Sequence, residues 1–226
     1  TLDKYIKGFP VGRTTFVAGT PGAGKTIMAL QFTDRCLRDG RRVCYITTEE
    51  RPVDLLDQAD GVGLKAVRKP YEDGQLTIVP LFEERAEEMK TFYLTEYHRV
   101  ARDFLILTRK IPAKTEVVII DNLGALSLGL SAEQFRDQFD ILNYILSQGG
   151  YTSLVVSDVS VNENMAVVAM HSAYAAIKMV KRENPYTGKI QRIMDIVKVR
   201  NSATPAEYLL YDITGKGIEI TGTVRE

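Results

Sequence analysis

The chain has 226 residues, 45% of them hydrophobic, with 29 basic and 29 acidic side chains. That length and apolar content suit one α/β domain with a substantial core. The zero formal charge excludes a global attraction to nucleic acid or to an anionic membrane, so binding to either would require a local basic patch.

Other features narrow the class of protein further. No apolar run approaches the ~20 residues that a membrane span requires. The two cysteines, Cys36 and Cys44, have neither metal-ligand nor CxxC spacing, so we expect buried, reduced thiols in a cytoplasmic protein. Residue Thr1 is not an initiator methionine and no signal-peptide pattern follows it, so we expect a trimmed start.

Strand-like and helix-like segments alternate along the first 158 residues, without a repeat or a linker between them. This alternation predicts a mostly parallel sheet with helices on its faces, in a single domain spanning residues 1–226. The expected strands are 14–18, 42–47, 76–79, 116–121 and 152–158, and the expected helices are 25–39, 52–61 and one that begins at Ser131.

Two further segments carry their own patterns. An apolar stripe at helical spacing predicts one long helix, through Met89, Tyr93, Tyr97, Val100, Phe104 and Leu107. Beyond residue 158 the pattern changes to strands joined by turns, at 177–180, 189–199 and 206–213. We expect these to be antiparallel hairpin strands that extend one edge of the sheet.

A glycine-rich loop lies between the first strand and the first helix and fits G-x-x-x-x-G-K-[ST] at every specified position. Glycines let the backbone N–H groups turn inward toward phosphate oxygens, and the following helix adds a partial positive charge. We therefore predict an ATP or ADP site in which Lys25 reaches the β- and γ-phosphates and assists catalysis. The predicted nucleotide-binding residues are Gly19, Thr20, Pro21, Gly22, Ala23, Gly24, Lys25, Thr26 and Ile27.

Acidic residues follow two of the predicted buried strands. Asp121 ends the apolar strand 116–121, and with the Thr26 hydroxyl it predicts a Mg²⁺ site. Glu49 and Glu50 follow the strand 42–47, where a carboxylate can orient or deprotonate the attacking water. Spacing alone leaves the alternative open that these two acids are only a solvated strand exit or a charge at the start of the next helix.

These segments together resemble KaiC-like ATPases of the RecA superfamily. The resemblance spans nearly the whole chain and rests on residues 17–32, 45–52 and 117–121 and on the closing Lys198-Val199-Arg200; residues 212–220 look like the ending of archaeal RadA paralogues in the same group. It implies a RecA-like P-loop fold and a Mg²⁺-dependent ATPase that assembles with itself as a hexameric ring.

The resemblance also implies roles for single residues. Glu49 matches the catalytic glutamate of RecA-type enzymes, with Glu50 beside it as a helper. Lys198 and Arg200 match basic residues that reach the γ-phosphate of the neighbouring subunit, and strand geometry points both to the same face. Asp158 stands at the family's sensor position, where Gln or Glu is usual, and its shorter side chain weakens that role.

The expected function is a nucleotide-driven regulatory switch that acts on a protein partner the sequence does not identify. A single hydroxyl, Ser172, occurs where clock members of the family carry a phosphorylated Ser-Thr pair, so we expect no phosphorylation clock. Two alternatives stay open: a recombination or repair accessory protein that binds single-stranded DNA, and a non-hydrolysing nucleotide-gated scaffold suggested by Asp158.

Single-stranded DNA is disfavoured by the charge of the segments that would contact it. Residues 123–134 and 149–177 contain no Lys or Arg, and phosphate binding depends on such side chains. We expect a loop in the second segment whose apolar residues pack against a neighbour or line a channel, from Val159 to Met170.

Overall fold

The computed structural model describes residues 2–81, 83, 103–127, 129–158, 163–185 and 187–225. Its strands form one nine-stranded sheet in the order β3-β2-β4-β5-β1-β6-β7-β8-β9. The strands are β1 Thr14–Gly19, β2 Val43–Thr47, β3 Leu76–Pro80, β4 Val117–Asp121, β5 Thr152–Asp158, β6 Ala175–Glu183, β7 Ile190–Val199, β8 Tyr208–Thr214 and β9 Gly217–Val224.

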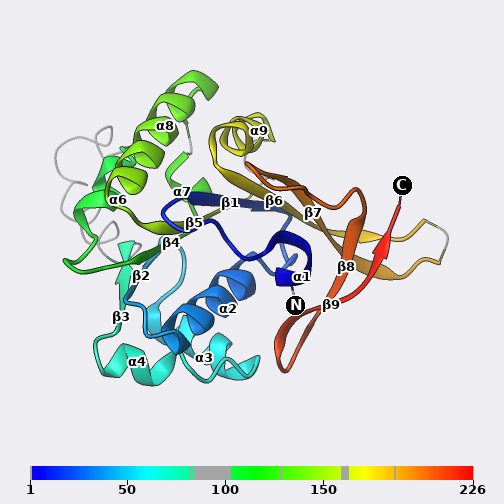
Figure 1. Cartoon of the computed structure of the whole chain (residues 1–226), viewed down its shortest axis with the longest axis horizontal. Coiled ribbons are helices and arrows are strands. Elements are labelled where there is room, and N and C mark those ends of the chain that lie inside the picture. Colours follow the sequence, from blue (N-terminus) through cyan, green and yellow to red (C-terminus); the bar gives the residue numbers. More distant parts are fainter. Residues whose placement is uncertain are drawn as a thin grey trace, which may run out of the picture.

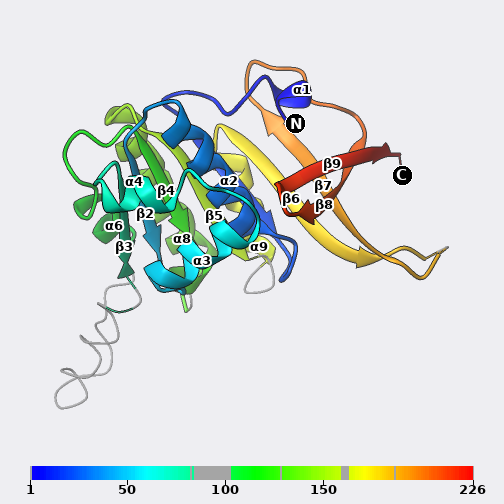
Figure 2. The same ribbon diagram turned by 90° about the horizontal axis from the view of Figure 1, so that it is seen from below.

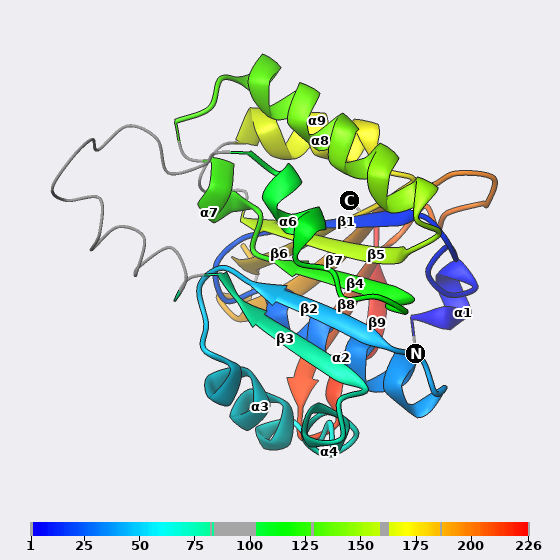
Figure 3. The same cartoon turned by 90° about the vertical axis from the view of Figure 1, so that its left-hand side faces the viewer.

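Helices cover both faces of the parallel part of the sheet. Figure 3 shows α2, α3 and α4 on one face and α6, α7, α8 and α9 on the other. The helices are α1 Asp3–Ile6, α2 Lys25–Arg38, α3 Pro52–Gly61, α4 Arg68–Glu72, α6 Leu105–Arg109, α7 Gly124–Ser127, α8 Ala132–Gln148 and α9 Glu163–Ser172. None of the helices in the described ranges is long and apolar enough to cross a membrane.

Strand alternation divides the core into two layers. Val17, Tyr45 and Ile119 pack with α2, whereas Phe16 and Ile46 point to the opposite face and pack with α8. Both faces of β1, β2 and β4 are buried, which explains why these strands read as continuous apolar runs. The two cysteines are free and buried, as expected.

The parallel pairings bring four strand ends to one edge of the sheet. Thr47 at the end of β2 pairs with Asp121 at the end of β4, and Gly19 at the end of β1 pairs with Asp158 at the end of β5. The predicted mostly parallel RecA-like core is thus confirmed, and its strand ends gather the glycine loop and the acidic residues.

The C-terminal strands extend the sheet on the β1 side, as predicted. β6 pairs with β1 in parallel, and β7, β8 and β9 follow in antiparallel pairing. Figures 1 and 2 show this extension projecting away from the helical layers. β6 is longer than the predicted 177–180, and β9 forms an edge strand that the strand analysis of the sequence did not include.

The predicted continuous helix through residues 89–107 is wrong at its C-terminal end. Most of that segment lies outside the described residues, but Asp103 and Phe104 are not helical and α6 begins at Leu105. The Asp103 carboxylate accepts the Leu105 N–H at 2.8 Å, and Gln138 accepts the Phe104 N–H at 3.0 Å. These side-chain bonds favour a turn over a continuing helix.

The expectation of a loop through residues 159–170 is also wrong from residue 163 onward, and residues 159–162 lie outside the described residues. Residues 163–172 form α9, whose Met165, Ala166 and Ala169 are buried in the core of the same chain. Val167 is 42% exposed. The apolar residues of α9 therefore pack largely within the chain, because α9 lies against α8.

Helix α8 supplies a stability prediction. Its N-cap Ser131 accepts the Gln134 N–H, and the Gln134 side chain accepts the Ser131 N–H, which makes a capping box. Ser131→Ala removes one of these bonds and is expected to lower the free energy of unfolding by about 1 kcal/mol in urea titration. Ser131→Asp, which restores the acceptor, serves as the control; equal stability of the alanine variant and the parent would contradict the prediction.

Candidate active site

The glycine loop adopts the conformation that a phosphate cradle needs. Gly22 and Gly24 have φ of 72° and 96°, in the left-handed region that other residues avoid. The first turn of a helix leaves its N–H groups without intrahelical partners, and in α2 these belong to Lys25, Thr26 and Ile27. The N-terminus of α2 therefore presents its first-turn backbone donors beside the glycine loop.

The outer side of the glycine loop is held by the C-terminal strands. The Thr20 N–H donates to the Met179 carbonyl at 3.1 Å, and the Lys181 N–H donates to Thr20 Oγ1 at 3.0 Å. From β8, the Tyr211 hydroxyl donates to the Ala23 carbonyl at 2.6 Å. Residues more than 150 positions away in the sequence thus fix the shape of the loop.

Lys25 is held at the centre of the site. Its Nζ donates to the carbonyls of Gly19 and Thr20 at 2.9 and 3.0 Å and forms an ion pair with Asp158 Oδ2 at 3.4 Å. The two side chains are only 10% and 18% exposed, so this pair is largely shielded from solvent. Asp158 does reach the site despite its short side chain, although its role as a sensor stays a prediction.

Asp121 lies directly beside the first turn of α2. The Tyr45 hydroxyl donates to its Oδ2 at 2.7 Å, and the Thr26 side chain is hydrogen-bonded to the same carboxylate. Burial raises the pKa of Asp121, while the bonds from Tyr45 and Thr26 oppose that shift. The predicted pair of Thr26 and Asp121 is thus brought together.

Glu49 and Glu50 face different partners. Asn122 Nδ2 donates to Glu49 Oε1 at 3.3 Å, and the Glu49 side chain stays exposed. Glu50 is half-buried and accepts a hydrogen bond from Gln58 on α3. Burial, reinforced by the charge of Asp121, raises the pKa of Glu50. Glu49 is therefore the acid tied to the end of β4, and Glu50 is turned toward α3.

Neutral donors hold most of this acidic cluster. Tyr45 and Thr26 bond Asp121, the Asn122 amide bonds Glu49, and the Gln58 amide bonds Glu50. The ion pair in this cluster is the one between Lys25 and Asp158, among the described residues. Mg²⁺ takes oxygen ligands, and in nucleotide sites it is bound by one or two carboxylates together with phosphate oxygens. The described residues hold no cluster of three metal-ligating side chains, but Asp121 and the Thr26 hydroxyl supply oxygens of this kind beside α2. The residues present therefore fit a bound Mg²⁺ ion.

Sequence reasoning missed Asn122, which lies between these acids. Its side chain contacts Glu49 and also accepts hydrogen bonds from the backbone N–H groups of Gly124 and Asp158. The residue is 6% exposed. Its position directly after Asp121 was the only signal in the sequence, and that signal does not show where an amide will point.

Lys198 and Arg200 lie away from the glycine loop of their own chain. Val199 pairs with Ala175, which in turn pairs with Thr15 near the start of β1, whereas the glycine loop follows the end of β1. Lys198 Nζ donates to the His171 carbonyl at 2.6 Å, and Arg200 contacts the same oxygen at 3.5 Å. Burial and the neighbouring Arg200 lower the pKa of Lys198.

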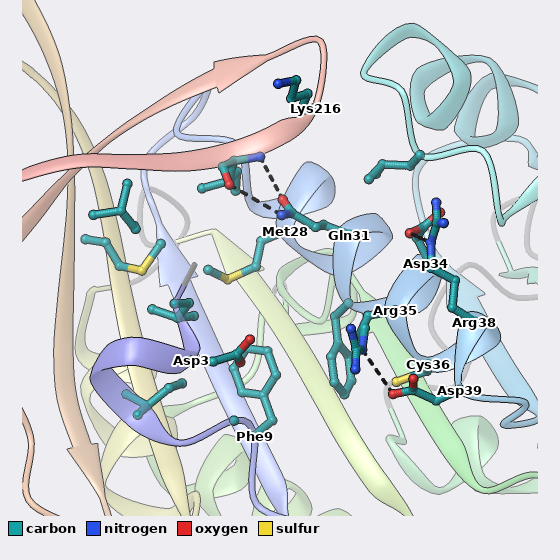
Figure 4. A pocket seen from close by; sticks show the side chains of 18 of the residues that line it. Asp3, Phe9, Met28, Gln31, Asp34, Arg35, Cys36, Arg38, Asp39 and Lys216 are labelled. Carbon is teal, nitrogen blue, oxygen red and sulfur yellow. Dashed lines mark hydrogen bonds and ion pairs between the residues drawn. The ribbon is translucent and has the colours of Figure 1, made fainter.

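A separate pocket of about 800 Å³ lies beside the middle and end of α2. Figure 4 shows Met28 and Gln31 of α2 facing it, with Asp3 and Phe9 on the opposite wall and Lys216 at its upper rim. Gln31 bridges α2 to β9 by bonding the N–H and carbonyl of Ile218 at 2.7 and 3.3 Å. None of residues 19–27 lines this pocket, so it is distinct from the glycine loop.

Comparison with known proteins identifies the family to which this arrangement belongs. A family model described as "ATPase: KaiC" matches residues 1–225. The chain belongs to the KaiC-like ATPase family. This membership supports nucleotide binding and an ATPase-type function, in agreement with the glycine loop and the acidic cluster.

Two kinds of relative share this KaiC-like sequence. A UPF0273 protein of Pyrococcus horikoshii is 29% identical over 96% of this chain and 89% of its own length, and one of Thermotoga maritima is 29% identical over 97% and 92%. The circadian clock oscillator protein KaiC 1 of Synechocystis is 28% identical, but the match covers only 41% of that protein.

The burial of Asp121 leads to a prediction about stability and pH. Because the folded-state pKa is raised, the ionised carboxylate destabilises the ligand-free protein above the unfolded pKa. Asp121→Asn is therefore expected to raise the thermal midpoint of the ligand-free protein at pH 7, and this gain should shrink as falling pH protonates Asp121 in the parent.

The matched control is Asp140→Asn on the exposed face of α8, which is expected to change stability by no more than about 0.5 kcal/mol. Scanning calorimetry at pH 7 and at acidic pH checks both variants. An Asp121→Asn midpoint at or below that of the parent at pH 7 would show that the buried charge is not destabilising.

Proposed function

We propose that this KaiC-like protein is a homo-oligomeric, Mg²⁺-dependent ATPase that acts as a nucleotide-driven switch on a protein partner. Each active site would lie between two copies of a single-domain chain, in the ring form that its family resemblance implies. The observation that carries the proposal is the separation of two groups of residues. Beside the carboxyl ends of the parallel strands lie Lys25, Thr26, Asp121 and Glu49, whereas Lys198 and Arg200 lie near the opposite, amino-terminal end of β1.

The residues of one copy account for binding the triphosphate. The donors of the glycine loop and of the first turn of α2 bind the phosphate oxygens, and Lys25 exchanges its carbonyl partners for the terminal phosphates. Thr26 and Asp121 would hold Mg²⁺, which when bound neutralises phosphate charge. Glu49, the more exposed of the two glutamates, orients the attacking water and accepts its proton, with Glu50 as a helper.

The position of Lys198 and Arg200 supports a role in a second copy. The two residues lie at the end of β7, which is next to Thr15 across the first residues of β6. Thr15 is four residues from Gly19, or about 13 Å along β1. Both basic side chains instead bond to the end of α9 in their own chain. Basic residues at a subunit interface can act as arginine fingers, which contribute roughly 10³ to 10⁵ in rate.

The ion pair between Lys25 and Asp158 supports a switch. A lysine that bonds phosphate has fewer donors left for Asp158, so nucleotide binding changes the partners of the residue that ends β5. Single-stranded DNA is not part of this proposal, since residues 123–134 and 149–177 lack Lys and Arg. A circadian-clock function is not part of the proposal either, although the KaiC relatives are named as clock proteins.

The first prediction of the proposed function concerns the two glutamates. Glu49→Gln keeps the size and one acceptor oxygen but removes the base, so we expect turnover to fall by about 10²- to 10⁴-fold with ATP affinity retained. Glu50→Gln is the matched control and should lose less, because Glu50 is turned toward Gln58. Phosphate release and calorimetric titration with MgATP measure the two quantities.

An unchanged rate of phosphate release in Glu49→Gln would show that Glu49 is not the catalytic base. Phosphate release at background level in the parent, together with normal ATP binding, would instead favour the non-hydrolysing scaffold.

The second prediction tests the shared site by mixing two inactive variants. Lys25→Ala lacks the phosphate lysine and Arg200→Ala lacks the trans group, so each alone is expected to be inactive. In random mixed oligomers at equal amounts, about a quarter of the interfaces combine an intact loop with an intact Arg200, and activity should return in that proportion.

Mixing the double variant Lys25→Ala/Arg200→Ala with the Lys25→Ala variant is the control, because no interface then has an intact loop. Failure of the first mixture to recover activity, while size-exclusion chromatography shows that mixed oligomers form, would contradict a trans role.

A further inference from the structure

We propose that Asn122 is a positioning residue that holds the Glu49 carboxylate in the orientation needed for attack on the nucleotide. The inference rests on the proposed function, because it takes Glu49 as the catalytic base. It assigns a role to a residue of the acidic edge that the sequence motifs do not include.

The orientation of the Asn122 amide is fixed by its oxygen. Oδ1 accepts the Gly124 N–H at 2.8 Å and the Asp158 N–H at 3.2 Å. An amide nitrogen cannot accept hydrogen bonds, so the oxygen must face these two donors and the NH₂ group must face the other way. Nδ2 therefore points to Glu49 Oε1, at 3.3 Å.

The backbone of Asn122 is held as firmly as its side chain. The Thr48 hydroxyl donates to the Asn122 carbonyl at 2.7 Å and accepts the Asn122 N–H at 3.0 Å. The Thr48 N–H donates to the Asp121 carbonyl at 2.9 Å. Thr48 precedes Glu49, so the ends of β2 and β4 are joined at the residue next to the predicted base.

This arrangement suits a catalytic base on an exposed turn. Glu49 is exposed and would otherwise sample several rotamers, so a donor on a buried, fixed residue limits where its carboxylate lies. Nδ2 bonds only Oε1, which leaves Oε2 free of this contact. A neutral amide orients the carboxylate with less loss of basicity than a cation would cause, because a cation stabilises the ionised form more strongly.

Asn122 also joins the base to the phosphate lysine. The same Oδ1 that orients the amide accepts the backbone N–H of Asp158, whose carboxylate pairs with Lys25. The ends of β2, β4 and β5 are thus linked through one side chain.

The test separates the donor from the acceptor of this amide. Asn122→Asp keeps an oxygen for the N–H groups of Gly124 and Asp158 but places a second oxygen, which cannot donate, against Glu49. At saturating ATP and Mg²⁺ we expect kcat to fall about 10- to 100-fold with the Kd for MgATP nearly unchanged. Asn122→Ser, too short to reach Glu49 but without added charge, is expected to lose kcat in the same way.

A double-mutant cycle with Glu49→Gln distinguishes a positioning role from a merely structural one, because only a positioning role makes the rate loss depend on Glu49. If Asn122 acts through Glu49, adding Asn122→Asp or Asn122→Ser to Glu49→Gln should lower single-turnover rates little further. Equal losses in both backgrounds, or a parental kcat in the two single variants, would overturn the assignment. A rate unaffected by Glu49→Gln alone would instead refute the proposed base, so the two failures are distinguishable.

Discussion

The structure depends on keeping a lysine ammonium and several carboxylates together at one edge of a buried sheet. Lys25 is mostly shielded from solvent, and in this chain it is stabilised by two loop carbonyls and by Asp158. A loop that can bend around this group needs glycines at Gly22 and Gly24, and it needs neighbouring strands that end at the same level. The parallel pairing of β1 with β5 and of β2 with β4 supplies that common edge.

The acidic residues at this edge are held mainly by neutral donors. Tyr45 bonds Asp121, Asn122 bonds Glu49 and Gln58 bonds Glu50. Such donors fix the carboxylates without neutralising them, which leaves negative charge near the space where a metal–phosphate complex would bind. This surplus opposes folding of the ligand-free chain and favours binding of a cation, a trade of stability for function that is common at active sites.

The C-terminal strands link this edge to the far end of the sheet. β6 and β8 contact the glycine loop through Met179 and Tyr211, and β7 runs antiparallel to β6 so that its last residues lie near the start of β1. The C-terminal extension therefore touches the glycine loop at one end and carries Lys198 and Arg200 at the other. In an oligomer whose chains pack head to tail, a conformational change at the glycine loop of one chain could therefore be transmitted to the glycine loop of the next.

The sequence by itself determined the glycine loop, the buried parallel strands and the family, because the spacing of glycines and the apolar runs can be read from neighbouring residues alone. That this loop binds phosphate stays a prediction. The sequence also predicted that Asp121 and Thr26 belong together. It could not determine that α6 begins only at Leu105, nor that α9 is a helix, since side-chain bonds from Asp103 and Gln138 and packing against α8 decide those conformations. Only the tertiary structure placed Asn122 between Glu49 and Asp158 and moved Lys198 and Arg200 away from their own loop, because strand order and register, rather than any local pattern, decide which distant residues meet.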